Sequence, residues 1–190
     1  MEIDWDATRA VLRSEMPERD AAGDDAARRA LELLLGEQTL RQSVDYYAEL
    51  RPARELVRSV LWVLRPWSAM VRCYELAQSP NDIETRRSAV ELLRAVADRR
   101  ALPWISEFLD DPDSQIQLWG IGIVDQLLFS DLVEPGEAEE LLKRAEHHEN
   151  SAVREQAEST RGYLRRREQE AAGEKQDEED GSDGTSSDEA

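Results

Sequence analysis

Cysteine is nearly absent from this sequence of 190 residues, since Cys73 is the only one. A single cysteine excludes an internal disulfide and a cysteine-rich zinc site, and the apolar neighbours Val71 and Leu76 predict a buried core residue. No apolar run approaches the roughly 18 residues that a membrane-spanning helix needs, and no basic and then apolar leader opens the chain. We therefore expect a cytoplasmic protein that does not enter a membrane.

Side chains that commonly carry catalysis or hold cofactors are also scarce. The only two histidines, His147 and His148, are adjacent, and neighbouring residues on a helix point about 100° apart, so they do not form a chelating pair. We interpret them as cations at a helix C-terminus. No nucleophile elbow, Walker loop or dinucleotide motif occurs, because Gly120 and Gly122 fall inside a predicted helix. The sequence accordingly predicts no enzymatic activity, no metal and no cofactor.

Basic side chains are few relative to acidic ones. The chain has 42 Asp and Glu residues against 24 Lys and Arg residues, for a formal net charge of −18. Such a field repels nucleic-acid phosphate and anionic lipid, and it speeds encounter with basic proteins. We expect no nucleic-acid or membrane binding, and a basic protein as partner. Whether the acidity reflects a high-salt cytosol or function is left open by the composition.

Apolar residues recur at helical spacing along the whole chain, and the alternation typical of strands is absent. The fold class is therefore predicted to be all-α. Turn and capping signals, among them Gly36, Pro66 and Asp82, divide the chain into helices. Ten are predicted, over about 4–16, 24–36, 39–50, 52–64, 67–77, 82–97, 101–109, 115–129, 137–147 and 151–170.

One helical template occurs in several copies. The copies are Thr85-Arg86-x-x-Ala89, Ile116-x-x-x-Gly120, Val153-Arg154-x-x-Ala157 and, more weakly, Val57-Arg58-x-x-Leu61. They lie 28 to 37 residues apart, which is near the period of helical-repeat proteins. Each copy falls on the second helix of a pair. Because one helix hairpin cannot bury its apolar stripe alone, neighbouring hairpins are expected to stack into a short superhelix.

The phrase Ala101-Leu102-Pro103-Trp104-Ile105-x-x-Phe108-Leu109, with the Asp-Pro-Asp turn that follows it, resembles the first helix and turn of a bacterial HEAT repeat. The template at Val153 resembles the second helix of another unit. The resemblance covers 51–164, with Gly120 and Arg161 as departures from the usual Ala and Leu. It implies an armadillo-like, right-handed α-solenoid of about four hairpins that binds protein through its concave face. A few relatives of this class are bilin lyases.

The repeats also divide the chain into parts and assign an interface. We predict an N-terminal helical cap over 1–36, a HEAT-like repeat domain over 37–170 and a disordered acidic tail over 171–190. The fifth residue after the start of each template is expected to lie between neighbouring repeats; these residues are Trp62, Val90, Ile121 and Glu158. The charged Glu158 then marks the end of the stack. All five tryptophans are assigned to the core.

The face that this register leaves open supplies the candidate partner-binding residues, which are Arg87, Glu91, Arg94, Leu118, Gly122, Asp125 and Phe129. Leu118 and Phe129 are the expected apolar anchors, with a shallow dent at Gly122 between them. In the alternative interpretation, the loop at 130–136 or the N-terminal cap covers both anchors. The functional hypothesis is a monomeric adaptor or scaffold. An acidic immunity or antitoxin-type inhibitor of a basic toxin and a HEAT-like bilin lyase or chaperone relative remain as alternatives.

Overall fold

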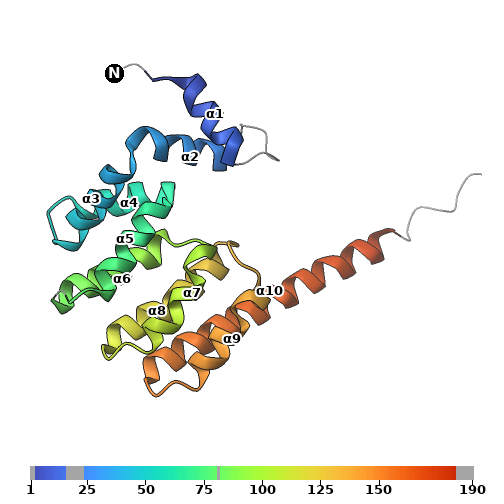
Figure 1. The fold of residues 1–190 in the computed structure, drawn as a ribbon. Helices are drawn as coiled ribbons and strands as arrows, with labels where there is room; N and C mark the ends of the chain where they lie inside the picture. The colour runs from blue at the N-terminus through green and yellow to red at the C-terminus, as the bar shows by residue number, and fades with distance from the viewer. Residues whose placement is uncertain (1–2, 16–23, 81, 183–190) are drawn as a thin grey trace, which may run out of the picture.

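The computed structural model describes residues 3–15, 24–80 and 82–182 (Figure 1). Within these residues the chain forms helices and no strand, which confirms the all-α fold class. The helices are α1 (Trp5–Glu15), α2 (Asp24–Leu35), α3 (Glu37–Ala48), α4 (Arg54–Leu64), α5 (Trp67–Gln78), α6 (Ile83–Val96), α7 (Leu102–Leu109), α8 (Ser114–Phe129), α9 (Pro135–Glu146) and α10 (Ser151–Ser182), with a short 3-10 helix, η1 (Arg99–Ala101), before α7.

The helices from α3 onward pack as four successive hairpins, α3–α4, α5–α6, α7–α8 and α9–α10. The second helices contact one another in chain order, α4 against α6, α6 against α8 and α8 against α10, so they form a continuous layer. On the other side, α3 contacts α5 and α7 contacts α9. At the N-terminal end, α1 packs on α2, which contacts both helices of the first hairpin. This arrangement is compatible with the predicted solenoid.

The core runs between the two helix layers, and the predicted register holds for three of its four interface positions. Val90 and Ile121 are fully buried, and Glu158 is exposed. Trp62, the fourth, is 50% exposed, so its assignment to an interface between repeats is wrong. The assignment of all five tryptophans to the core is also wrong for Trp5 and Trp67, which are 61% and 38% exposed. Cys73 is buried as expected, and desolvation raises the pKa of its thiol.

An Asp or Asn side chain caps the N-terminus of each of the last three second helices. Asp82 accepts hydrogen bonds from the first-turn backbone of α6, and Asn150 accepts one from the Ala152 N–H at the start of α10. Asp113 Oδ1 accepts from the backbone N–H groups of Gln115 and Ile116 at 3.1 Å each. These acceptors satisfy donors that a helix start leaves unpaired, which explains where α6, α8 and α10 begin.

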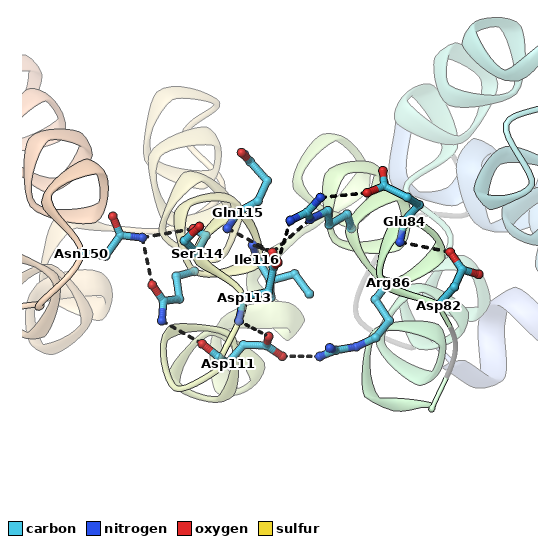
Figure 2. Close-up of polar contacts among 11 residues, drawn as sticks. Asp82, Glu84, Arg86, Asp111, Asp113, Ser114, Gln115, Ile116 and Asn150 are labelled. Atoms are coloured by element: carbon cyan, nitrogen blue, oxygen red, sulfur yellow. Dashed lines mark hydrogen bonds and ion pairs between the residues drawn. The ribbon is translucent and has the colours of Figure 1, made fainter.

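The same turns are linked from one hairpin to the next (Figure 2). Arg86 on α6 pairs with Asp111 in the α7–α8 turn. Gln117 Nε2 donates to the Asp111 carbonyl at 2.7 Å, and Asn150 Nδ2 donates to Gln117 Oε1 at 2.9 Å. Arg87 Nη2 donates to Asp113 Oδ2 at 2.8 Å. This run of polar contacts fixes one end of α8 relative to α6 and α10.

Gly120 and Arg161, where the sequence departs from the expected Ala and Leu, each lie at a contact between the two helices of a hairpin. A Cβ at Gly120 would lie 2.6 Å from Phe108 Cβ, so α7 and α8 approach too closely there for alanine. Arg161 is half-buried and pairs with Glu139 and Glu146 on α9, at 2.5 and 2.8 Å. Those hydrogen bonds raise the pKa of its guanidinium. A polar link between α9 and α10 therefore replaces the apolar contact that leucine would make.

Helix boundaries follow the prediction closely except at two places. Helix α4 begins at Arg54 rather than at Pro52, because 52–53 form a turn. Helix α10 continues past its predicted end near Glu170 to Ser182 and extends away from the stack in Figure 1. The acidic segment predicted to be disordered thus begins inside a helix, where Ala, Glu, Gln and Lys are all favourable. Its last part, 183–190, lies outside the described residues.

Candidate protein-binding surface

The seven candidate residues lie on two neighbouring second helices. Arg87, Glu91 and Arg94 are on α6, and the other four, Leu118, Gly122, Asp125 and Phe129, are on α8. Because α6 packs directly on α8, the structure brings part of the set together. The closest approach is at Arg94 and Gly122, where a Cβ on the glycine would lie 3.1 Å from Arg94 Cδ.

Three of the four charged candidates are engaged within the chain. Arg87 pairs with Glu84 as well as with Asp113, and the hydrogen bonds that it donates to Asp113 raise the pKa of the Arg87 guanidinium. Glu91 accepts a hydrogen bond from Arg54 Nη2 at 3.3 Å. Asp125 accepts one from the Thr160 hydroxyl at 3.0 Å. These side chains join neighbouring helices. The charges of Arg87 and Glu91 are partly neutralised by ion pairs, whereas Asp125 keeps its charge and accepts from a neutral hydroxyl.

Arg94 differs from them. It is half-buried, yet it makes no hydrogen bond and no ion pair with any residue that the structure describes. Its side chain lies over the α8 backbone at Gly122, with Cδ and Nε both 3.1 Å from the position that a Cβ would occupy there. The guanidinium is therefore held on the surface between α6 and α8 with its donors available.

The two expected anchors are not equivalent. Leu118 is half-buried and packs against the core, so it contributes to folding. Phe129 is 64% exposed, with its ring 5.4 Å from that of Tyr163 on α10 and tilted by 43°. The alternative in which a loop or the N-terminal cap covers both anchors is wrong for Phe129. A large aromatic ring is thus presented to solvent at the end of α8.

A cavity that sequence reasoning missed lies beside these residues. It has a volume of about 210 Å³ and is lined by Arg58, Ser59, Trp62, Ala95 and Gln126, so it spans α4, α6 and α8. Trp62 was assigned to a buried interface because it is the fifth residue after the start of the template copy at Val57, which is the weakest of the four copies. The composition of α4 could have indicated that some of its apolar side chains are exposed. Six of its last nine residues, Leu56 to Leu64, are aliphatic, which is more than one helix stripe can bury.

A second apolar region lies between α2 and α4. Its cavity, of about 450 Å³, is lined by Leu31, Leu35, Ser59, Val60, Val63 and Leu64. The four large side chains other than Leu64 are exposed. The sequence did not predict this region, because 1–36 was treated only as a cap that seals the first hairpin.

The two histidines that follow α9 have structural partners, and the hydrogen bonds of His148 are those of a neutral imidazole, so its interpretation as a cation at the helix C-terminus is wrong. His148 Nδ1 accepts from the Asn150 backbone N–H at 3.1 Å, so Nε2 carries the proton and donates to the Leu109 carbonyl at 2.9 Å. His147 Nδ1 lies 2.9 Å from the Lys143 carbonyl.

Across the described part of the chain, no group of three or more His, Cys, Asp or Glu side chains is arranged to hold a metal ion. None of the described helices is long and apolar enough to cross a membrane.

Comparison of the chain with protein-family models, with curated proteins and with solved structures finds no match.

Proposed function

We propose that this protein is a non-catalytic, HEAT-like adaptor of the cytoplasm that binds a protein partner through the surface formed by α4, α6 and α8. One observation carries the proposal. Trp62 and Phe129, on α4 and α8, are 50% and 64% exposed on the layer of second helices. Large aromatic side chains are the residues most enriched among those that dominate binding energy at protein interfaces. We refer to the surface around Trp62, Arg94 and Phe129 as the inner surface.

The charge of the chain supports a protein partner over nucleic acid. With a formal net charge of −18, the protein attracts a basic partner at long range and repels phosphate backbones. Electrostatic steering of this kind is screened by salt, so association with the partner should slow as ionic strength rises.

The test compares partner capture by matched variants. Tagged wild-type protein and the Trp62→Ser/Phe129→Ser double variant are used as bait in a lysate of the source organism, and bound proteins are identified by mass spectrometry. Trp5→Ser is the control, because Trp5 is exposed to a similar degree but lies on α1. We expect the double variant to keep its melting temperature and to lose a partner that both other baits retain. Equal capture of every protein by all three baits would refute the proposal.

A further inference from the structure

The arginines of α6 fall into two groups. Arg86 and Arg87, in the first turns of the helix, pair with Asp111 and Asp113 of the following turn. Arg94, about two helical turns further on, has no partner among the described residues although it is half-buried. Removing a charge from water without a partner is unfavourable. A half-buried guanidinium without a carboxylate partner among the described residues is able to accept an acidic group from another molecule.

The chain holds this guanidinium in place and supplies no carboxylate to it. Gly122 leaves the space in which the side chain lies, since a Cβ there would be 3.1 Å from Arg94 Nε and 3.6 Å from Cζ. Glycine in a helix interior is less favourable than alanine by up to about 1 kcal/mol. The nearest acidic candidates are engaged elsewhere, Glu91 with Arg54 and Asp125 with Thr160.

The cavity beside Trp62 is lined by chain neighbours of Arg94 and Gly122, although by neither of these two residues. Ala95, which follows Arg94 in the chain, and Gln126, one turn beyond Gly122, both line it. Its volume of about 210 Å³ is smaller than the roughly 300–1,000 Å³ of typical small-molecule sites. It is therefore suited to a single side chain rather than to a cofactor or metabolite.

We propose that the inner surface binds a peptide segment of the partner in which an acidic side chain lies close to a large apolar one. The carboxylate pairs with the Arg94 guanidinium, which can donate two parallel hydrogen bonds. The apolar side chain packs against the exposed ring of Trp62. This inference rests on the proposed protein-binding function and specifies the chemistry of its partner. Because the protein is acidic overall, an acidic segment gains only from this local pairing, which gives the contact its selectivity.

The test uses a phage-displayed library of random peptides as the probe. The library is selected on wild-type protein, and selected sequences are synthesised with a fluorophore and titrated by fluorescence polarisation against Arg94→Gln, Arg94→Lys, Trp62→Ser and Arg13→Gln. Arg13, an exposed arginine in the last turn of α1, controls for the loss of one positive charge. We expect selected peptides to share an acidic residue near an apolar one. Arg94→Gln should weaken their binding roughly 10- to 100-fold, as expected for a charged hydrogen-bonded pair, with Arg94→Lys intermediate.

The outcomes separate the two proposals. Peptides that require Trp62 but bind Arg94→Gln as tightly as wild type would overturn the inference about the carboxylate and leave the protein-binding proposal standing. The same holds if the selected peptides lack a shared acidic residue. A selection that yields no peptide dependent on Trp62 would refute both. Circular-dichroism melts of each variant show that binding is compared between folded proteins.

Discussion

Replacement of Gly120 by alanine tests the close approach of α7 and α8. Alanine is the better helix former, by up to about 1 kcal/mol, so a surface glycine in the same position would be stabilised by the change. At Gly120, however, the new Cβ would lie 2.6 Å from Phe108 Cβ and 3.6 Å from the Phe108 backbone carbon. Phe108 is buried, and its Cβ is fixed by the α7 backbone, so no rotamer change relieves the overlap. Helices α7 and α8 must separate.

The expected size of the effect follows from two opposing contributions. Overpacking in a core that must shift costs typically 1–3 kcal/mol, occasionally more. The separation of α7 from α8 also weakens neighbouring contacts, so we take the upper part of that range and subtract the gain in helix propensity. The net loss of unfolding free energy is then about 2 kcal/mol. For a chain of this size, that corresponds to a fall in melting temperature of roughly 4–8 °C.

Gly122→Ala is the matched control, since it makes the same chemical change two residues later on the same helix. There the new Cβ would meet Arg94 Cδ and Nε at 3.1 Å, and a flexible side chain can move by a few tenths of an ångström. We expect unchanged or slightly higher stability in urea unfolding followed by circular dichroism at 222 nm, with weaker binding of the selected peptides. Wild-type stability in Gly120→Ala would refute the close approach of α7 and α8.

Three further predictions concern the register, the turn and the tail. Ile121→Glu should lower the unfolding free energy by on the order of 3 kcal/mol or more, since Ile121 is fully buried. Glu158→Ala should be near neutral. The reverse ranking in denaturant melts would disprove the register. The hydrogen bond from Arg87 lowers the pKa of Asp113. The stability that the pair of Arg87 and ionised Asp113 contributes is therefore present above pH ~4 and is lost as pH falls through the lowered pKa. Asp113→Asn retains the helix cap and should be less stable than wild type at pH 7, with the difference vanishing in acid titrations of stability. Truncation after Gly173 should leave the melting temperature within a few degrees, because the last buried side chain described is Leu164; a larger drop would show that the tail packs.

Much of this fold could be predicted because its signals are local. Asp82 begins α6 as a cap, and Pro66 separates α4 from α5, as both residue types favour in isolation. The pairing of hairpins followed from repetition alone, since a residue template that recurs every few tens of residues fixes which helices stack. Val90 and Ile121 were found in this way without any knowledge of their neighbours.

The errors lie where a property depends on two helices at once. Gly120 and Gly122 look alike in the sequence, but only the approach of Phe108 to the first makes it irreplaceable. Trp62 was assigned from the weakest template copy, and its exposure depends on how much of α4 the cap and α6 cover. Likewise, nothing in the sequence distinguishes Leu118 from Phe129. Leu118 packs against the core, whereas Phe129 is exposed although Leu128 beside it is buried.

The division between structural and recognition arginines on α6 follows from repeat geometry. Helix α6 begins beside the turn between α7 and α8, so Arg86 meets Asp111 in that turn and Arg87 meets Asp113, which caps α8. A helix rises 1.5 Å per residue, which places Arg94 roughly 10–12 Å beyond those turn carboxylates. In mid-helix, the charge of Arg94 is solvated by water or paired with a carboxylate of its own helix, a neighbouring helix or a bound partner. No described carboxylate pairs with it, since Glu91 and Asp125 bond to other residues, and under our proposal the partner supplies one.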